Sequence, residues 1–367
     1  MTGYFDANAT TPLRPEARTA WLEGVDRFWA NPSSPYRLAG EAHRQLERCR
    51  NRLGELLGVP SGELVFTSGA TEANHAFIQW VAERMRSGAL RSGLWVSPIE
   101  HPCVTEAVRH HLKPGEVRIL TVDAQGRVES PPAEDGEVPG MVSLMLANNE
   151  TGVMQPVEEW AEWCAARGVL LHCDAVQLPG KGPLAVLGKL PVFVLSAHKF
   201  GGPKGVGLLR ISGAALEFTG QRGGAQENGH RAGTENLPGI LGMTAALEAV
   251  AGEPLPGPEG RDAFEAMLPE DFVVIGQEAP RLPNTSMVIP PDGDQLRWVR
   301  RLDRGGFQVS TGSACSTGKE SSSVVLAAMG LDSSVRRRVL RLSSLPGTPV
   351  SAWQALAETM RGMRDQG

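Results

Sequence analysis

The chain has 367 residues, of which 41% are hydrophobic and 21% charged, a balance typical of a protein that folds around an apolar core. Its 36 basic and 41 acidic residues give a net charge of -5, which excludes bulk attraction to nucleic acid or to an anionic membrane. No apolar run approaches the roughly 20 residues that span a bilayer, and the first residues show no signal-peptide pattern. We therefore expect a cytoplasmic protein that binds a small molecule or a protein partner.

Six short apolar runs rich in β-branched residues predict strands in the first 200 residues, and segments with helical spacing lie between most of them. Strands that alternate with helices favour a mostly parallel sheet covered on both faces, with functional residues at the carboxyl ends of its strands. The runs are LVFTS (64–68), LWVS (94–97), VRILTV (117–122), MVSLMLA (141–147), VLLHCDA (169–175) and VFVLS (192–196).

The composition changes after about residue 250, where AGEPLPGPEG (251–260) is typical of a linker. Beyond it, VVIG and SMVIP predict strands, and helical patterns cover about 294–304 and 351–363. We expect an α/β fold of two domains. The large domain is predicted over 16–250, and a smaller α+β domain over 1–15 and 251–367.

Four of the predicted strands end in polar residues of the kinds that one cofactor needs. In TSGATE a strand turns into a helix, so free amides and the hydroxyls of Ser68 and Thr71 offer an anion site. An ordinary capped turn is the alternative. His101 can stack on an aromatic ring or serve as a structural residue. Asp174, with Gln177 three residues on, can pair with a pyridine nitrogen or cap a helix.

Lys199 follows the last of these strands, in the stretch SAHKFGGPKGVG. Ser196 and His198 precede it, and a run of glycines follows it. A lysine that is buried here must be neutralised, paired or chemically bonded. A surface lysine in a flexible loop is the alternative. A covalent bond to an aldehyde would remove the free ammonium, and glycines let the backbone pass close to a flat ligand. Anion site, ring stacker, acidic partner and lysine together match the requirements of pyridoxal 5'-phosphate.

Ten sequence blocks that run nearly from end to end carry a closer resemblance. They are YFDANATTP (4–12), NPSSPYRLAG (31–40), VFTSGATEAN (65–74), EHPCV (100–104), NNETGVMQP (148–156), HCDAVQLPGK (172–181), SAHKFGGPKGVG (196–207), RAGTENLPGI (231–240), RLPNT (281–285) and STGSACSTG (310–318). In this order they resemble the cysteine desulfurases of the NifS/IscS type, in the class V aminotransferase group of fold-type I pyridoxal-phosphate enzymes. The resemblance implies a mostly parallel seven-stranded sheet in the large domain and a homodimer with composite active sites.

The same resemblance implies roles around the cofactor ring. Lys199 would bond the cofactor and then move the Cα proton of the substrate. Asp174 would hold the pyridine nitrogen protonated, which makes the ring an electron sink. His101 would stack on the ring and transfer protons, and Gln177 would contact the ring hydroxyl.

Phosphate and substrate contacts are implied in the same way. Asn149 and Arg341 would hold the substrate carboxylate, a task that suits the fork of an arginine. Thr234 is expected to reach the phosphate of the partner subunit. The remaining phosphate contacts would come from Ala70, Thr71, Ser196 and His198.

Five cysteines, an odd number without CxxC spacing, argue against a disulfide framework and against a zinc site. Cys49 and Cys164 fall in helical patterns and Cys173 in a strand, so we expect all three in the core. Cys103 lies two residues from His101 and therefore close to the predicted site.

Cys315 lies in GSACSTG, where the residues alone allow either a reactive thiol in an accessible loop or an inert packed one. The resemblance implies that its thiolate attacks the sulfur of L-cysteine, which leaves L-alanine and a persulfide on Cys315. The sulfur would pass to an acceptor protein for iron–sulfur cluster assembly or another thiolation pathway. A selenocysteine lyase, a cystine C–S lyase or a class V aminotransferase would keep the cofactor. A silent scaffold would have no need of Lys199 facing an acid.

The chain departs from the family pattern at three places. The segment after the Cys315 motif reads KESSSVVLAAMG and lacks the usual Leu-Glu-Pro stretch, although its length is kept. Leu345 stands where a glycine is usual, with Gly347 two residues on. The region from about 245 to 280 is shorter than usual, so we predict that no long unbroken helix crosses 250–275.

Overall fold

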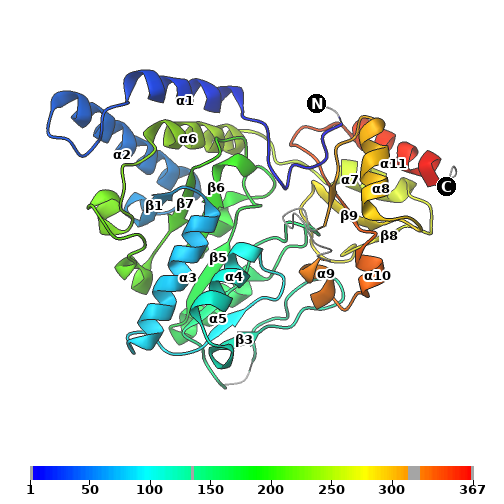
Figure 1. The fold of residues 1–367 in the computed structure, drawn as a ribbon, viewed down its shortest axis with the longest axis horizontal. Coiled ribbons are helices and arrows are strands. Elements are labelled where there is room, and N and C mark those ends of the chain that lie inside the picture. The colour runs from blue at the N-terminus through cyan, green and yellow to red at the C-terminus, as the bar shows by residue number, and fades with distance from the viewer. Residues whose placement is uncertain (1–2, 134–135, 313–322, 365–367) are drawn as a thin grey trace.

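The computed structural model describes residues 3–133, 136–312 and 323–364 (Figure 1). The larger sheet that it contains has seven strands in the order β1-β7-β6-β5-β4-β2-β3. Strands β2 to β6 run parallel to their neighbours in this order, while β7 is antiparallel to both β1 and β6. The strands are β1 (Leu64–Thr67), β2 (Leu94–Val96), β3 (Val117–Ile119), β4 (Met141–Ser143), β5 (Leu170–Asp174), β6 (Val192–Ser196) and β7 (Gly207–Arg210).

All six strands predicted in this region are confirmed, with their ends shifted by a few residues. The strand predicted over 141–147 is the most shortened, since β4 ends at Ser143. Strand β7 was not predicted. It follows the glycine-rich segment after Lys199, and its own glycine, Gly207, pairs with Thr67 and with Ser196. The mostly parallel α/β sheet is therefore confirmed, with one antiparallel strand added.

Helices cover both faces of this sheet because successive strand side chains point to opposite sides. Val65 packs in the same apolar cluster as Phe77 of α3, whereas its neighbour Phe66 packs with Leu53 of α2. Helix α1 lies outside α6 (Figure 1), where Gly24 permits a close approach to Pro238. The helices around the large sheet are α1 (Pro15–Arg27), α2 (Arg37–Leu57), α3 (Ala70–Arg86), α4 (Pro102–His111), α5 (Val157–Arg167) and α6 (Leu237–Gly252).

A second sheet is antiparallel throughout and has the strand order β10-β11-β9-β8. Its core joins Phe264, Trp298 and Trp353, from three different helices, to Leu342 of β11. The strands are β8 (Val273–Val274), β9 (Thr285–Ile289), β10 (Ser310–Thr311) and β11 (Leu340–Ser343). The helices are α7 (Glu259–Met267), α8 (Gln295–Arg304), α9 (Val324–Ala328), α10 (Ser333–Arg336) and α11 (Val350–Arg364).

The N-terminal segment belongs with this smaller sheet in space. The Phe5 amide donates to the Gln308 carbonyl at 2.8 Å, and the Ser343 amide donates to the Phe5 carbonyl at 2.9 Å. The side chain of Phe5 is fully buried against the same core. These contacts support the predicted grouping of 1–15 with 251–367, and the domain boundaries themselves stay a prediction.

The helices predicted near 294–304 and 351–363 are confirmed as α8 and α11. Helix α6 ends at Gly252 and α7 begins at Glu259, so no unbroken helix crosses 250–275, as predicted. Short 3-10 segments complete the described chain: Ser61–Glu63, Pro114–Glu116, Leu184–Lys189, Ala197–Lys199, Gly213–Glu217 and Gln226–Gly229. In the part of the chain that the structure describes, no helix is both long and apolar enough to cross a membrane.

Candidate active site

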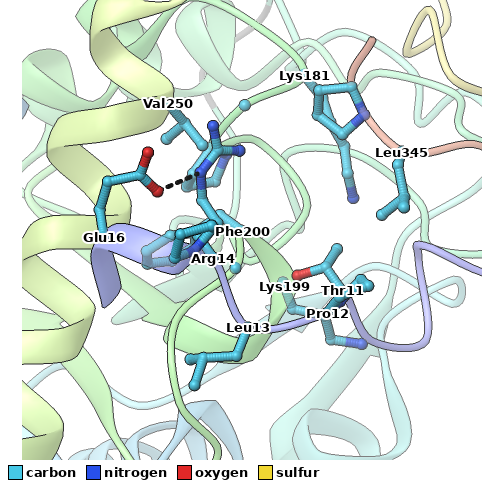
Figure 2. Close-up of a pocket in the computed structure, with 15 residues that line it drawn as sticks. Thr11, Pro12, Leu13, Arg14, Glu16, Lys181, Lys199, Phe200, Val250 and Leu345 are labelled. Atoms are coloured by element: carbon cyan, nitrogen blue, oxygen red, sulfur yellow. Dashed lines mark ion pairs between the residues drawn. The ribbon is translucent and has the colours of Figure 1, made fainter. Parts of the chain in front are cut away.

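Lys199 lies at the end of β6, where the large sheet meets the N-terminal segment. Its Nζ donates to the carbonyls of Asn8 and Ala9 at 2.7 and 2.9 Å, and the side chain is half-buried. Figure 2 shows Lys199 and Lys181 in the wall of a cavity of about 260 Å³, with Leu345 nearby. The residue that replaces the usual glycine therefore lines a cavity beside the candidate lysine.

Asp174 and His101 approach Lys199 from two other strand ends. Asp174 ends β5 and is 7% exposed, and its two oxygens accept from the Val176 amide at 3.1 Å and from Asn74 Nδ2 at 3.0 Å. His101 caps the N-terminus of α4. Burial, reinforced by Lys199, lowers the pKa of His101 against the opposing effect of Asp174. The structure thus brings Lys199, Asp174 and His101 close enough for the charges of the first two to act on the imidazole of the third.

The predicted phosphate site lies between β1 and β6. No side chain caps α3, so the first amides of this helix, from Ala70 and Thr71, are available to an anion. A Cβ at Gly207 would come within 2.6 Å of the Gly69 Cα, so a glycine is required between the two strand ends. A Cβ at Gly69 would lie 3.8 Å from Ser196 Oγ, which places this hydroxyl beside the helix terminus.

His198 and Thr234, the other two expected phosphate contacts, differ in burial: His198 is half-buried and Thr234 is exposed. His198 Nδ1 is 3.1 Å from Thr10 Oγ1. Burial and the charges of Lys199 and Lys204 lower the pKa of His198 to about 4, so its imidazole is neutral near pH 7. Thr234 is exposed, in the segment between the 3-10 turn Gln226–Gly229 and α6.

Gln177 is held in place by Lys181, a lysine that the sequence analysis did not single out. Gln177 is buried, and its Nε2 donates to the Asn8 carbonyl at 3.0 Å. Lys181 Nζ donates to Gln177 Oε1 and, at 3.0 Å, to Asn8 Oδ1. Burial lowers the pKa of Lys181 well below its usual range. The resulting contacts fix which way the amide of Gln177 faces.

Arg341 and Asn149 meet at the small sheet. Arg341 lies on β11, 2% exposed, and donates through Nη2 to Asp6 Oδ1 at 2.7 Å and through Nη1 to the Asn149 carbonyl at 3.2 Å. Its Nε is buried with no hydrogen-bond partner among the described residues. A buried donor without a partner is costly, so this atom is suited to an anionic ligand.

The cysteines divide as the sequence suggested, except that Cys315 lies outside the described residues. Cys49, Cys164 and Cys173 are buried in the core, as predicted. Burial raises the pKa of Cys49 to about 11, that of Cys164 to about 12 and that of Cys173 well above its ordinary value. Cys103 is half-buried, and burial followed by Asp174 raises its pKa to about 12. None of these four is a thiolate near pH 7.

A profile of the aminotransferase class V family matches residues 3–343. The chain belongs to the class V aminotransferase family. A cysteine desulfurase of Cereibacter sphaeroides is 37% identical to this chain, and the alignment covers 99% of this chain and 96% of the relative. One of Klebsiella pneumoniae is 36% identical, over 93% and 87%. The solved structure of a NifS-like protein has a TM-score of 0.88 at 30% identity and covers both chains fully.

The residues of this class V aminotransferase fit pyridoxal 5'-phosphate, the cofactor of the family. The uncapped α3 terminus beside Ser196 suits its phosphate, and the carboxylate of Asp174 suits a protonated ring nitrogen. His101 interacts electrostatically with both Lys199 and that carboxylate. The fold expected for a fold-type I enzyme is confirmed by the sheet and by the structural relative.

Sequence reasoning missed three buried polar residues behind Asp174. Asn74 donates to it, and His172 Nε2 lies 2.9 Å from Asn74 Oδ1. Glu100 accepts from the Met145 amide at 2.6 Å, and burial, followed by repulsion from Asp174, raises its pKa well above the usual range. One signal was available: His172 and Asp174 are two apart on a strand and so point to the same face.

The exposed segment that carries Thr234 is tied to the large sheet by a buried ion pair. Glu227 and Asn228 have φ of 49° and 55°, a left-handed conformation that costs energy in residues other than glycine. Arg50 of α2 binds both carboxylate oxygens of Glu227 at 2.8 Å. One of them also accepts from the Phe66 amide at 2.7 Å. The strained turn is therefore held next to β1.

Glu227→Gln is expected to lower the free energy of unfolding by about 3 kcal/mol, because Arg50 would lose its buried bidentate counterion and keep only the half-exposed Glu47. Urea unfolding followed by circular dichroism measures this. Glu248→Gln is the matched control: because Glu248 pairs with Arg52 at the surface, where solvent screens the charges, this variant should lose much less stability. Equal losses in the two variants would show that the Arg50 pair has no special role.

Proposed function

We propose that this protein is an L-cysteine desulfurase that uses pyridoxal 5'-phosphate, releases L-alanine and carries the sulfur as a persulfide on Cys315. The observation that carries the proposal is the convergence of Lys199, Asp174 and His101 at three strand ends. It occurs in a chain that is 37% and 36% identical to curated cysteine desulfurases.

Each group around the cofactor has a task that follows from its position. When bound, pyridoxal phosphate withdraws electrons from the Cα of an amino acid. Asp174 would accept a hydrogen bond from the ring nitrogen, and Gln177 would donate to the ring hydroxyl. Lys199 would hold the cofactor and would accept the Cα proton of the substrate at Nζ. Arg341 binds the substrate carboxylate through its unpartnered Nε.

Phosphate binding combines helix amides with neutral side chains. The amides of Ala70 and Thr71 and the hydroxyl of Ser196 would donate to the phosphate. His198, kept neutral by burial, has Nδ1 next to Thr10 Oγ1 and would contact the phosphate through Nε2. Together they neutralise little charge, so the α3 terminus provides most of the attraction.

Sulfur transfer requires a thiolate, and the described cysteines do not supply one. All four have a pKa that burial raises above the ordinary value of a thiol. Cys315, in its glycine-flanked segment, is the remaining thiol of the chain. Its sulfur attacks the sulfur of the bound cysteine. The new S–S bond forms as the C–S bond breaks, and the electron pair of that bond stays on carbon, which is protonated to give alanine.

We further propose a homodimer with composite sites. Thr234 is exposed, as expected of a residue that serves the partner subunit. Large apolar side chains are also exposed on α1 and the segment that follows, a pattern typical of an interaction surface. They are Trp21, Leu22, Val25, Trp29 and Tyr36. A cytoplasmic acceptor protein would then take the sulfur for iron–sulfur cluster assembly or another thiolation pathway.

The test is a single turnover of purified, cofactor-loaded protein with L-cysteine, followed by intact mass and peptide mapping without reductant. We expect equimolar alanine and a gain of one sulfur atom on Cys315, and neither in Cys315→Ala. Alanine and free sulfide from unmodified protein would indicate a lyase instead. A keto acid without sulfide would indicate an aminotransferase, and no turnover would favour a scaffold.

A further inference from the structure

Cys103, the half-buried thiol beside the ring-stacking histidine, is in contact with two polar side chains of the site. Its Sγ lies 3.0 Å from His101 Nδ1 and 3.1 Å from Asn74 Nδ2. The backbone amide of Cys103 also donates to His101 Nδ1, at 3.2 Å. The hydroxyl of Thr71, an expected phosphate ligand, interacts with the same sulfur. The thiol of Cys103 thus contacts His101, Thr71 and the Asn74 side chain that donates to Asp174.

The directions of these hydrogen bonds follow from the backbone amide. An N–H can only donate, so Nδ1 of His101 uses its lone pair and the ring proton is on Nε2. The Sγ–Nδ1 contact then requires the thiol to donate its hydrogen to Nδ1. Asn74 Nδ2, also a donor only, uses the sulfur as an acceptor. Burial raises the pKa of Cys103 to about 12, so the thiol hydrogen is present near pH 7.

Asn74 cannot turn its amide over without losing a buried partner. Its Oδ1 faces His172 Nε2 at 2.9 Å, and His172 Nδ1 lies 3.0 Å from Ser143 Oγ. Burial lowers the pKa of His172 to about 4, so its ring is neutral and donates from Nε2. Phe77 stacks on this ring at 5.6 Å between centroids. Both hydrogens of Asn74 Nδ2 are therefore directed forward, one to Asp174 and one to Cys103.

We infer that Cys103 is a positioning residue: its thiol donates to His101 Nδ1 while Asn74 holds its sulfur, so that His101 presents a protonated Nε2 in one ring orientation. The same Asn74 amide positions Asp174, so the ring stacker and the partner of the ring nitrogen are aligned by one buried network. The role of His101 as a ring contact rests on the proposed function. The hydrogen-bond assignment does not, because it depends only on the described contacts.

The charged and titratable groups around this network are few. Asp174 and Lys199 act on His101 with opposite signs, and Glu100 and Asp174 face Cys103. Loss of the thiol donor removes a hydrogen bond that favours the neutral imidazole, so the pKa of His101 should rise. Cys103 itself, with its raised pKa, acts as a hydrogen-bond donor and is a poor nucleophile for sulfur.

The test uses the cofactor-loaded protein without substrate, labelled with ¹⁵N-histidine, and follows the two ring nitrogens of His101 by NMR across about pH 6 to 9. His101→Gln assigns the signals. We expect an unprotonated Nδ1 and a protonated Nε2 in the wild type. In Cys103→Ala the backbone amide still donates to Nδ1, so the tautomer should be kept, but the Nδ1 signal should shift and the pKa of His101 should rise. Cys103→Ser, which keeps a donor, should restore the wild-type pattern. Cys49→Ala, the same change in the core of α2, should leave His101 unaltered.

Turnover supplies an independent readout. Cys103→Ala should lower kcat for L-cysteine by roughly 2- to 10-fold, the effect of one neutral hydrogen bond, with little change in KM. Cys103→Ser should retain most of the rate. Wild-type nitrogen signals in Cys103→Ala, or a protonated Nδ1 in the wild type, would overturn the inference. A wild type that forms no alanine, yet shows the expected nitrogen signals, would refute the desulfurase function and leave the inference standing.

Discussion

Lys199→Ala is expected to lower kcat for L-cysteine by at least about 1,000-fold, the largest loss of any single change in the described chain. The variant would lose both the covalent attachment of the cofactor and the base that takes the Cα proton. Alanine formation under saturating cofactor measures the rate. Absorption spectra with and without dialysis measure retention of the cofactor, which should become reversible.

Lys204→Ala is the matched control for this change. Lys204 lies five residues on in the same glycine-rich segment, but its side chain is exposed and acts on the site through its charge, which helps to lower the pKa of His198. Its variant should keep wild-type turnover and firmly bound cofactor. If Lys204→Ala were as impaired as Lys199→Ala, the loss would reflect a general disturbance of the segment. If Lys199→Ala turned over cysteine at the wild-type rate, the assignment of the cofactor lysine would be wrong.

The large sheet was predictable because its strands, apart from the exposed edge strand β3, are buried on both faces and read as continuous apolar runs. The run VFVLS, for example, matches β6 over its full length. Strand β7 was not predicted because it begins at Gly207 and follows a glycine-rich stretch that indicates a loop. Antiparallel insertion of this strand between β1 and β6 is a property of the tertiary structure, and no local pattern reports it.

From residue patterns alone, the candidate site was predictable only where its residues stand next to a strand end, whereas Arg341 and Thr234 came from the family resemblance. Lys199, His101 and Asp174 each follow an apolar run, and the carboxyl ends of such strands meet at one edge. Asn74 lies inside α3 and Lys181 in a loop, where polar residues usually indicate a solvated face. Asn74 contacts Asp174, 100 positions away, and Lys181 contacts Asn8, 173 positions away. Contacts of this range exist only once the sheet is assembled.

The buried network also explains why so many polar residues are tolerated behind the site. Asn74, His172 and Ser143 are each fully buried, yet each has a partner, so none pays for desolvation without a hydrogen bond. Such a satisfied network is rigid because every member fixes the orientation of the next. Asp174 stands at its front end, which makes its carboxylate the most informative position to change.

Asp174→Asn is expected to lower kcat by roughly 100- to 1,000-fold, because an amide cannot stabilise positive charge on the ring nitrogen. The amide is isosteric, so the contacts to Asn74 and Val176 are disturbed less than by a truncation. Turnover of L-cysteine and the absorption of the bound cofactor measure the effect. Asp262→Asn, at an exposed acid paired with Arg261, should leave both unchanged.

A cofactor analogue methylated on the ring nitrogen separates charge from geometry in this variant. Its nitrogen carries a fixed positive charge and needs no proton, so it should restore part of the lost rate in Asp174→Asn. The same analogue should impair the wild type, where the methyl group would press against the buried carboxylate. If Asp174→Asn kept full activity with the natural cofactor, Asp174 would not be the partner of the ring nitrogen, and the network behind it would be structural.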